Sequence, residues 1–153
     1  MEKEEILAQL RAAKAAHISW VQRAKFLIEG FTINESSIPV NSTECKFGKW
    51  FYTEGQRLNE IRNNPIESMT NIEELHQQLH DVYLNIYKIY YETGKAGFFS
   101  KMFGQKNKVT DTDETLAREY LREIETISKE LIKALNIMER RITVVADEEI
   151  KAI

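Results

Sequence analysis

The chain has 153 residues, of which 42% are hydrophobic and 29% are charged, as expected for a globular protein with a core of its own. The formal net charge of −3 argues against nucleic acid as a partner, because phosphate binding needs a clustered basic face. No apolar run approaches the roughly 18 residues of a membrane span, and the charged N-terminus does not resemble a secretory signal. We therefore expect a cytoplasmic protein without an integral membrane segment, folded as a single domain over residues 1–153.

The apolar pattern of the first segment predicts one long helix over residues 2–29. Its apolar side chains recur at alternating steps of four and three, which is typical of a helix that buries one face in a bundle. His17 belongs to this stripe and should therefore face the interior, and Gly30 marks the expected end of the helix. The stripe consists of Ile6, Leu10, Ala13, His17, Trp20, Ala24 and Leu27.

A connection and a second, shorter helix should follow. Residues 31–44 are rich in Asn, Ser, Thr and Pro, which favour turns. We expect the second helix to open at one of residues 42–44, to carry Cys45 near its start and to run as far as Ile61. The sequence Asn-Asn-Pro at 63–65 should then break it, because the residue before a proline avoids helical backbone angles.

The third helix is expected from residue 65 or 66 to Thr93, where Gly94 provides a natural stop. Two neighbouring stripes run along its surface. The first stripe is apolar and consists of Ile72, Leu75, Leu79, Val82, Ile86 and Ile89. The second is aromatic and consists of His76, His80, Tyr83, Tyr87 and Tyr90.

Residues 94–111 predict a loop with three glycines, four lysines and an apolar cluster. This cluster is either a partner or membrane contact or, as we favour, a group that folds onto the end of the bundle. It consists of Phe98, Phe99, Met102 and Phe103.

The last helix should begin near Thr112 or Asp113, since acidic residues suit a helix start. The tail, residues 144–153, either continues this helix or frays. The expected buried face consists of Leu116, Tyr120, Ile124, Ile127, Leu131, Ala134, Met138 and Ile142. Four helices in one chain predict an all-α fold, namely an antiparallel four-helix bundle with a loop insertion before the last helix.

His76 and His80 lie four residues apart, so on a helix both side chains share one face and can hold one metal ion. A zinc protease would need a glutamate at position 77 as general base, and Gln77 cannot serve. His17 faces the interior from the first helix. Cys45 lies at a helix start, where peptide dipoles favour the thiolate.

Each of these residues by itself has an ordinary explanation, because an inner histidine is usually hydrogen-bonded in a core and a buried cysteine is usually an inert hydrophobe. Together, however, they account for all three histidines and the one cysteine of the chain. One cysteine and three histidines supply the four N and S ligands that Zn²⁺ prefers. With every position filled by protein, no place remains for a substrate water, so the site would be structural or regulatory and not catalytic.

Three sequence blocks resemble the signature of the chemoreceptor zinc-binding (CZB) domain, which reads H-x-x-aromatic, then C-x-hydrophobic-G-x-hydrophobic, then H-x-x-x-H. The blocks are His17–Trp20, Cys45–Trp50 and His76–His80, in order and at comparable intervals. The resemblance covers roughly residues 10–142 of the chain. It implies a helical bundle that binds Zn²⁺ through His17, Cys45, His76 and His80.

The resemblance also places four further residues at supporting positions. Trp20 and Trp50 should wall the metal from water, and Gly48 should let the second helix approach a neighbour closely. Phe47 is the fourth of these residues.

The resemblance further implies a sensory or regulatory function in bacterial signalling, of the chemotaxis or cyclic-di-GMP type, with an output tied to zinc level or thiol oxidation. A homodimer is expected, partly from the heptad-like stripes of the first and last helices but mainly from the family. The sequence contains no receptor coiled coil and no cyclase domain. The output partner would then be a separate signalling protein, or the chain would be a fragment of a longer one.

Two rival functions stay open. A di-iron bundle, acting as oxygen carrier or enzyme, needs paired Glu-x-x-His motifs, of which this chain has one at Glu73 and His76. A metal-free helical adaptor would merely bury its histidines.

Overall fold

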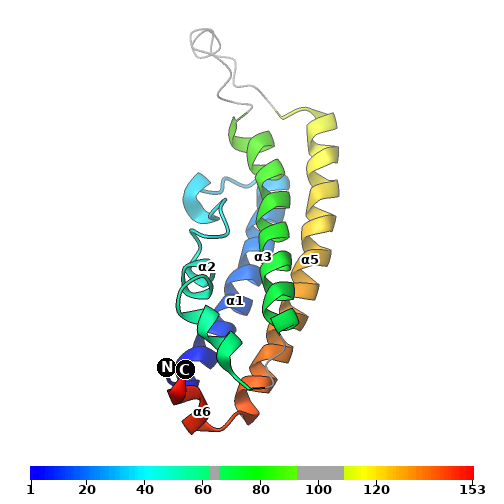
Figure 1. Ribbon diagram of the computed structural model, residues 1–153. Coiled ribbons are helices and arrows are strands. Elements are labelled where there is room, and N and C mark those ends of the chain that lie inside the picture. The colour runs from blue at the N-terminus through cyan, green and yellow to red at the C-terminus, as the bar shows by residue number, and fades with distance from the viewer. Residues whose placement is uncertain (63–65, 93–108) are drawn as a thin grey trace.

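The protein is described by a computed structural model over residues 1–62, 66–92 and 109–153, and its secondary structure there is entirely helical (Figure 1). The helices are α1 (Lys3–Ile28), α2 (Lys46–Phe51), α3 (Ile66–Tyr87), α5 (Asp111–Val144) and α6 (Asp147–Ala152). Shorter elements are the 3-10 turns η1 (Glu35–Ser37) and η2 (Glu54–Glu60) and the π-helical segment η3 (Lys88–Glu92).

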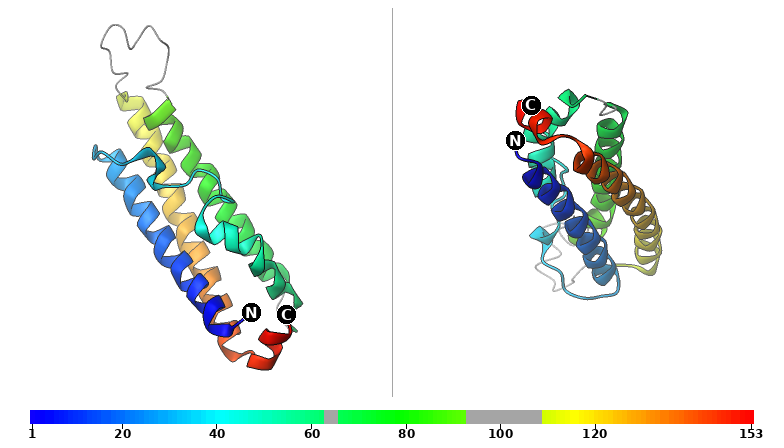
Figure 2. Two further views of the ribbon diagram at one scale, coloured as in Figure 1. Left: turned by 90° about the vertical axis from the view of Figure 1, so that its left-hand side faces the viewer. Right: turned by 90° about the horizontal axis from the view of Figure 1, so that it is seen from below.

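The chain runs up α1, down through α2 and η2, up α3 and down α5, and both termini lie at the same end (Figures 1 and 2). The long helix α5 packs against both α1 and α3, and α2 packs on α1. The antiparallel all-α bundle predicted from the sequence is therefore confirmed. None of the helices within the described ranges has an apolar stretch long enough to cross a bilayer.

The first helix follows its prediction closely, and all seven residues of its predicted stripe are buried. Its end is a Schellman motif, in which Phe31 N–H donates to Phe26 O and Gly30 N–H donates to Leu27 O. Gly30 has a φ of 96°, which a residue with a Cβ adopts only with strain. The Phe26 and Phe31 rings pack 5.6 Å apart across this turn and fix the direction in which the chain leaves α1.

The prediction of one helix from residues 42–44 to Ile61 is wrong. Cys45 is the N-cap, α2 ends at Phe51, and the 3-10 turn η2 follows. Thr53 interrupts the helix with φ −117° and ψ −97°, while its hydroxyl donates to Lys49 O at 2.6 Å. Gly55 then lies directly against the Trp50 ring, where an added Cβ would come within 3.3 Å of a ring carbon. Packing of Trp50 therefore decides the break, which helix propensity does not reveal.

The third helix starts as expected, but its regular α-helical part ends at Tyr87 and continues as the π-helical segment η3. The expected end at Thr93 and Gly94 lies outside the described residues, as do Phe98, Phe99, Met102 and Phe103.

The last helix begins one to two residues earlier than predicted, because Thr110 forms a capping box with Asp113. Its buried face also differs in the first half: Leu116 is 39% exposed, whereas Ala117 and Leu121 are buried. Counted back from Ile142, buried residues recur at alternating steps of four and three and form a continuous seam along α5. This spacing places Ala117, and not Leu116, in the seam.

The tail neither continues α5 nor frays. Val145 and Ala146 are extended, and α6 turns back across the end of the bundle (Figure 2). Ile150 and Ile153 are buried there, and Asp147 pairs with Lys3 at 2.6 Å. The helix is interrupted at Val145 and Ala146, but the burial of Ile150 and Ile153 holds α6 against the end of the bundle.

Substitution of Leu131 by Ala should lower the free energy of unfolding by about 2–5 kcal/mol, since Leu131 is fully buried in the seam of α5. The matched variant Leu116→Ala should cost no more than about 0.5 kcal/mol, because Leu116 is exposed. Urea denaturation of both variants measures the difference. Equal losses at the two positions would contradict the seam described here.

Candidate metal centre

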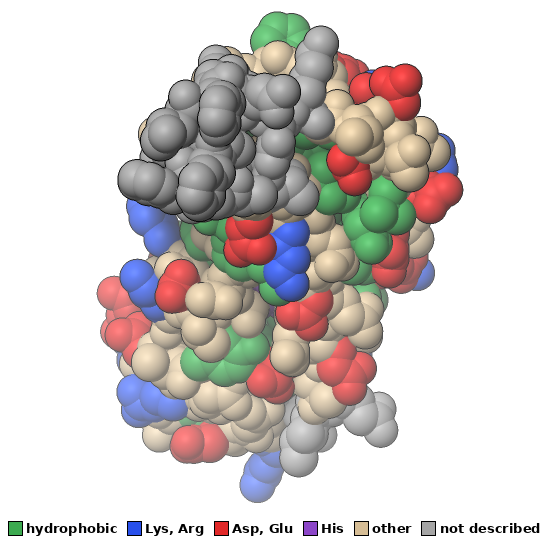
Figure 3. Space-filling view, turned by 90° about the horizontal axis from the view of Figure 1, so that it is seen from above, with side chains coloured by type: hydrophobic (Ala, Val, Ile, Leu, Met, Phe, Trp, Pro, Cys, Tyr) green, Lys and Arg blue, Asp and Glu red, His purple; other side chains and the backbone are tan. Residues whose placement is uncertain are grey.

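All four residues predicted as metal ligands come together in the core. His17 lies in the middle of α1, Cys45 caps α2, and His76 and His80 lie one turn apart on α3. One nitrogen or sulfur atom from each side chain lies within 4.8 Å of every other. The four side chains are between 0% and 5% exposed, and no histidine is visible on the end face drawn in Figure 3.

The shortest separations within the cluster match a tetrahedral metal site. His76 Nε2 lies 3.2 Å from His80 Nε2 and 3.3 Å from Cys45 Sγ. Zinc bonds of about 2.0–2.1 Å to nitrogen and 2.3 Å to sulfur would give tetrahedral edges of roughly 3.3 Å between nitrogens and roughly 3.6 Å between nitrogen and sulfur. The donor atoms are therefore close to the spacing that a tetrahedral Zn²⁺ requires.

Two of the imidazoles are fixed in the tautomer that a metal needs. His17 Nδ1–H donates to Ala13 O at 2.6 Å, and His80 Nδ1–H donates to Val40 O at 3.0 Å. Because a carbonyl oxygen can only accept, the proton of each neutral ring must be on Nδ1, which leaves the lone pair on Nε2. Such outer hydrogen bonds are what orients metal-bound histidines in general.

Two ring nitrogens in the cluster have no hydrogen-bond partner within the described residues, namely His17 Nε2 and His76 Nδ1. Buried polar atoms are nearly always satisfied, so each such exception needs an explanation. A metal ion within the cluster would satisfy His17 Nε2. His76 differs from the other two histidines because no carbonyl holds its second nitrogen.

Cys45 reaches the cluster from a tight turn. Its sulfur accepts a hydrogen bond from Gly48 N–H at 3.1 Å and lies 3.4 Å from Ser42 O. A Cβ on Gly48 would lie 1.8 Å from Ser42 O, so no other residue fits at this position without displacing backbone. The close approach expected of Gly48 is present, but its neighbour is the preceding loop and not another helix.

Burial controls the ionisation of the cluster in the metal-free protein. It lowers the pKa of His76 to about 2 and that of His80 to about 4, and it lowers the pKa of His17 as well. Burial also raises the pKa of the Cys45 thiol, which the Gly48 amide only partly offsets. The amides of Gly48 and Phe47 at the helix start do lower the thiol pKa, as expected there, but burial outweighs them. The imidazoles are neutral and ready to bind, whereas the thiol would lose its proton to a bound metal.

Aromatic rings close two sides of the cluster. The Trp20 ring lies 4.4 Å from His80 and 4.9 Å from His17, and the Phe47 ring lies 5.0 Å from His76, measured between centroids. Trp50 packs on Phe47 at 5.9 Å. The wall predicted from Trp20 and Trp50 is thus formed by Trp20 and Phe47, whereas Trp50 packs against Phe47.

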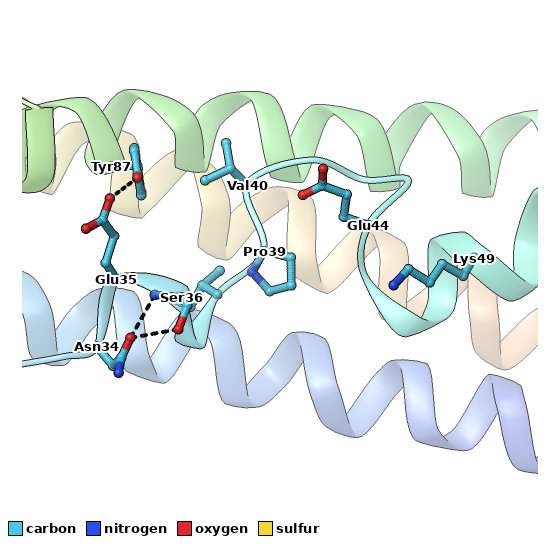
Figure 4. Close-up of a pocket in the computed structure, with 9 residues that line it drawn as sticks. Asn34, Glu35, Ser36, Pro39, Val40, Glu44, Lys49 and Tyr87 are labelled. Atoms are coloured by element: carbon cyan, nitrogen blue, oxygen red, sulfur yellow. Dashed lines mark hydrogen bonds between the residues drawn. The ribbon is translucent and has the colours of Figure 1, made fainter.

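The loop between α1 and α2 is attached at three successive points, two on α3 and one on η3. His80 Nδ1–H donates to Val40 O, Tyr87 OH donates to the Glu35 carboxylate, and Tyr91 OH donates to Ile33 O at 2.9 Å. A hollow of about 840 Å³ lies beside this loop, and Figure 4 shows the hydrogen bond between Tyr87 and Glu35, two of the residues that line it. No pattern in the sequence points to Ala13 and Val40, because they contribute backbone carbonyls and not side chains.

Substitution of Gly48 by Ala should weaken Zn²⁺ binding at least about tenfold, since the new methyl group must displace either Ser42 or the Cys45 cap. The control Lys46→Ala lies in the same short helix and is exposed, so its affinity should equal that of the wild type. Competition with a chromophoric chelator measures both affinities. Unchanged binding by the Gly48 variant would contradict this account of the turn.

Acid should destabilise the metal-free protein. The unfolded histidines titrate near pH 6.5, whereas the pKa values of His76 and His80 in the fold are about 2 and about 4, so the unfolded state binds more protons in this window. Stability is thus present above pH 6.5 and is lost as the pH falls. Between pH 7 and pH 5 the two residues should cost about 4 kcal/mol together.

Urea denaturation of chelator-treated protein at both pH values measures this loss. His76→Leu should remove roughly half of the pH dependence. Stability that does not change between pH 7 and pH 5 would show that the imidazoles are not buried in neutral form.

Comparison with known proteins gives one match. Residues 17–87 match the family model of the chemoreceptor zinc-binding domain. The matched segment begins at His17 and contains Cys45, His76 and His80, although it is shorter than the resemblance over residues 10–142. Neither the curated proteins nor the solved structures contain a match to this chain. The resemblance to the zinc-binding family of chemoreceptor domains is nevertheless confirmed over residues 17–87, which are similar to that family in sequence.

Proposed function

We propose that the protein binds one Zn²⁺ through His17, Cys45, His76 and His80 and acts as a sensory or regulatory module of bacterial signalling, within a single domain over residues 1–153. The observation that carries this proposal is the buried cluster itself, in which four donor atoms lie within 4.8 Å of one another. The fixed tautomers of His17 and His80 support it, since both rings present a lone pair to the same point.

A regulatory role is favoured over catalysis by the number of protein donors. Four donors complete a tetrahedral zinc shell, whereas a catalytic zinc keeps one position for water or substrate. A di-iron function is disfavoured because the cluster in the described part of the chain includes no carboxylate. A metal-free adaptor would have to leave His17 Nε2 buried and unpaired, which costs about 1–3 kcal/mol.

The sulfur of Cys45 offers a way to couple the site to the fold. It is both a ligand candidate and the N-cap acceptor of α2, which has six residues and is too short to be stable by itself. Oxidation of the thiol or loss of zinc would therefore release α2 from α1 and α3. We propose that a change in zinc level or in the redox state of Cys45 is converted in this way into a structural signal.

The output would pass to a second copy of the chain or to a separate signalling protein. Ile18, Phe26 and Phe31 are 51%, 44% and 61% exposed along and just beyond α1. Exposed hydrophobic side chains on and just beyond α1 support a homodimer formed through this helix. The signalling pathway, whether chemotaxis or cyclic-di-GMP control, would be set by that partner.

Purified protein should contain one zinc per chain, and Cys45→Ser should bind it at least about 100-fold more weakly, because loss of even an outer-shell partner costs about 10–100-fold. Lys46→Ala, next in the chain and exposed, should keep full affinity. Native mass spectrometry with and without chelator reports metal identity, stoichiometry and oligomeric state together. Chelator should also lower the melting temperature of the wild type but not that of the Cys45 variant.

Three results would contradict the proposal. If the Cys45→Ser variant contained as much zinc as the wild type, the thiol would not be a zinc ligand. Two irons with visible absorption would favour the di-iron protein. Stability indifferent to metal removal would favour the adaptor.

A further inference from the structure

A small groove leads from the surface to the thiol. It has a volume of about 210 Å³ and runs between α1 and the start of α2. Gln9, Ala12, Ala16 and Lys46 line it and are exposed, so its mouth is at the surface. Its further lining residues are Ala13, His17, Trp20, Pro39, Cys45 and Phe47.

Short side chains create this groove. Ala12 and Ala16 lie one turn apart on the same face of α1, and neither reaches across to Phe47 as a longer side chain would. A liquid water molecule occupies about 30 Å³, so the groove accommodates several molecules of that size. Trp20 and Phe47 cover the imidazoles elsewhere, as described above. The groove therefore reaches the cluster on the side of Cys45 and His17, whose Nε2 is buried and unpartnered.

We propose that this groove is the route by which small uncharged molecules, such as a peroxide, reach the sulfur of Cys45. Its lining is mainly apolar, which disfavours the entry of charged reagents because they would lose their hydration. In the reaction with a peroxide, the thiolate attacks one oxygen, the O–O bond breaks and hydroxide leaves, which gives a sulfenic acid. The role of this step in signalling rests on the proposed function, but the route itself does not.

Groove-filling variants test the route. Ala16→Leu alone, or together with Ala12→Leu, should cover the groove, because a helical side chain lies over the turn before its own Cα. Leucine is also a good helix former, so α1 should persist. Ala15→Leu is the matched control, since Ala15 is exposed on the same helix but does not line the groove.

The probe is methyl methanethiosulfonate, a small neutral reagent with which the thiolate forms an S–S bond while methanesulfinate leaves. Its second-order rate constant is measured by mass spectrometry on the full chain, both as purified and after chelator treatment, at 0 and 1 M urea. Ala16→Leu and the double variant should react at least tenfold more slowly than the wild type. Ala15→Leu should stay within twofold, and the wild-type rate should not change with urea.

Equal rates in all variants, rising with urea, would overturn the proposal and show that the thiol is reached by opening of α2. This failure is distinct from failure of the proposed function, which zinc content reports separately. A groove-filled variant that reacts slowly and still contains one zinc per chain would support both.

Discussion

The convergence of three imidazoles and one thiol at a single buried point is the constraint around which this bundle is organised. Burying polar groups costs free energy unless each finds a partner, and in this cluster one ring nitrogen of His17 has none among the described residues. Two backbone carbonyls hold His17 and His80 in one tautomer, and a glycine without a Cβ lets the Cys45 turn close. These features orient donors at one point, which ordinary core packing does not require.

The long helices supply a rigid frame, and the short elements supply the coupling. Helices α1, α3 and α5 bury continuous apolar seams, so His17 and His76 are held at fixed positions. In contrast, α2 has six residues and a sulfur as its cap. Its stability must come from its contacts with α1 and with the cluster, because helix propensity over so few residues is insufficient. A change at the sulfur therefore acts first on the element that is least able to keep its structure without it.

The loop before α2 extends this coupling along the bundle. It is attached to α3 through His80 and Tyr87 and to η3 through Tyr91, so the position of one ligand candidate and the course of the loop depend on each other. The groove beside Ala12 and Ala16 adds a path from solvent to the same sulfur that caps α2. The groove thus connects the protein surface to the thiol, and the thiol in turn caps the short helix α2.

The sequence by itself determined the helical bundle, the interior position of His17 and the four residues of the cluster, because periodic apolar stripes and the His and Cys spacings depend on local geometry. It did not determine the end of α2 at Phe51, the burial of Ala117 on α5 or the docking of α6. Nor did it show that Phe47, and not Trp50, packs against the histidines. These features depend on contacts between segments far apart in the chain, such as Lys3 with Asp147 or His76 with Phe47. The carbonyls of Ala13 and Val40 could not be read from any side-chain pattern, since every residue has a carbonyl and only the tertiary structure aims it.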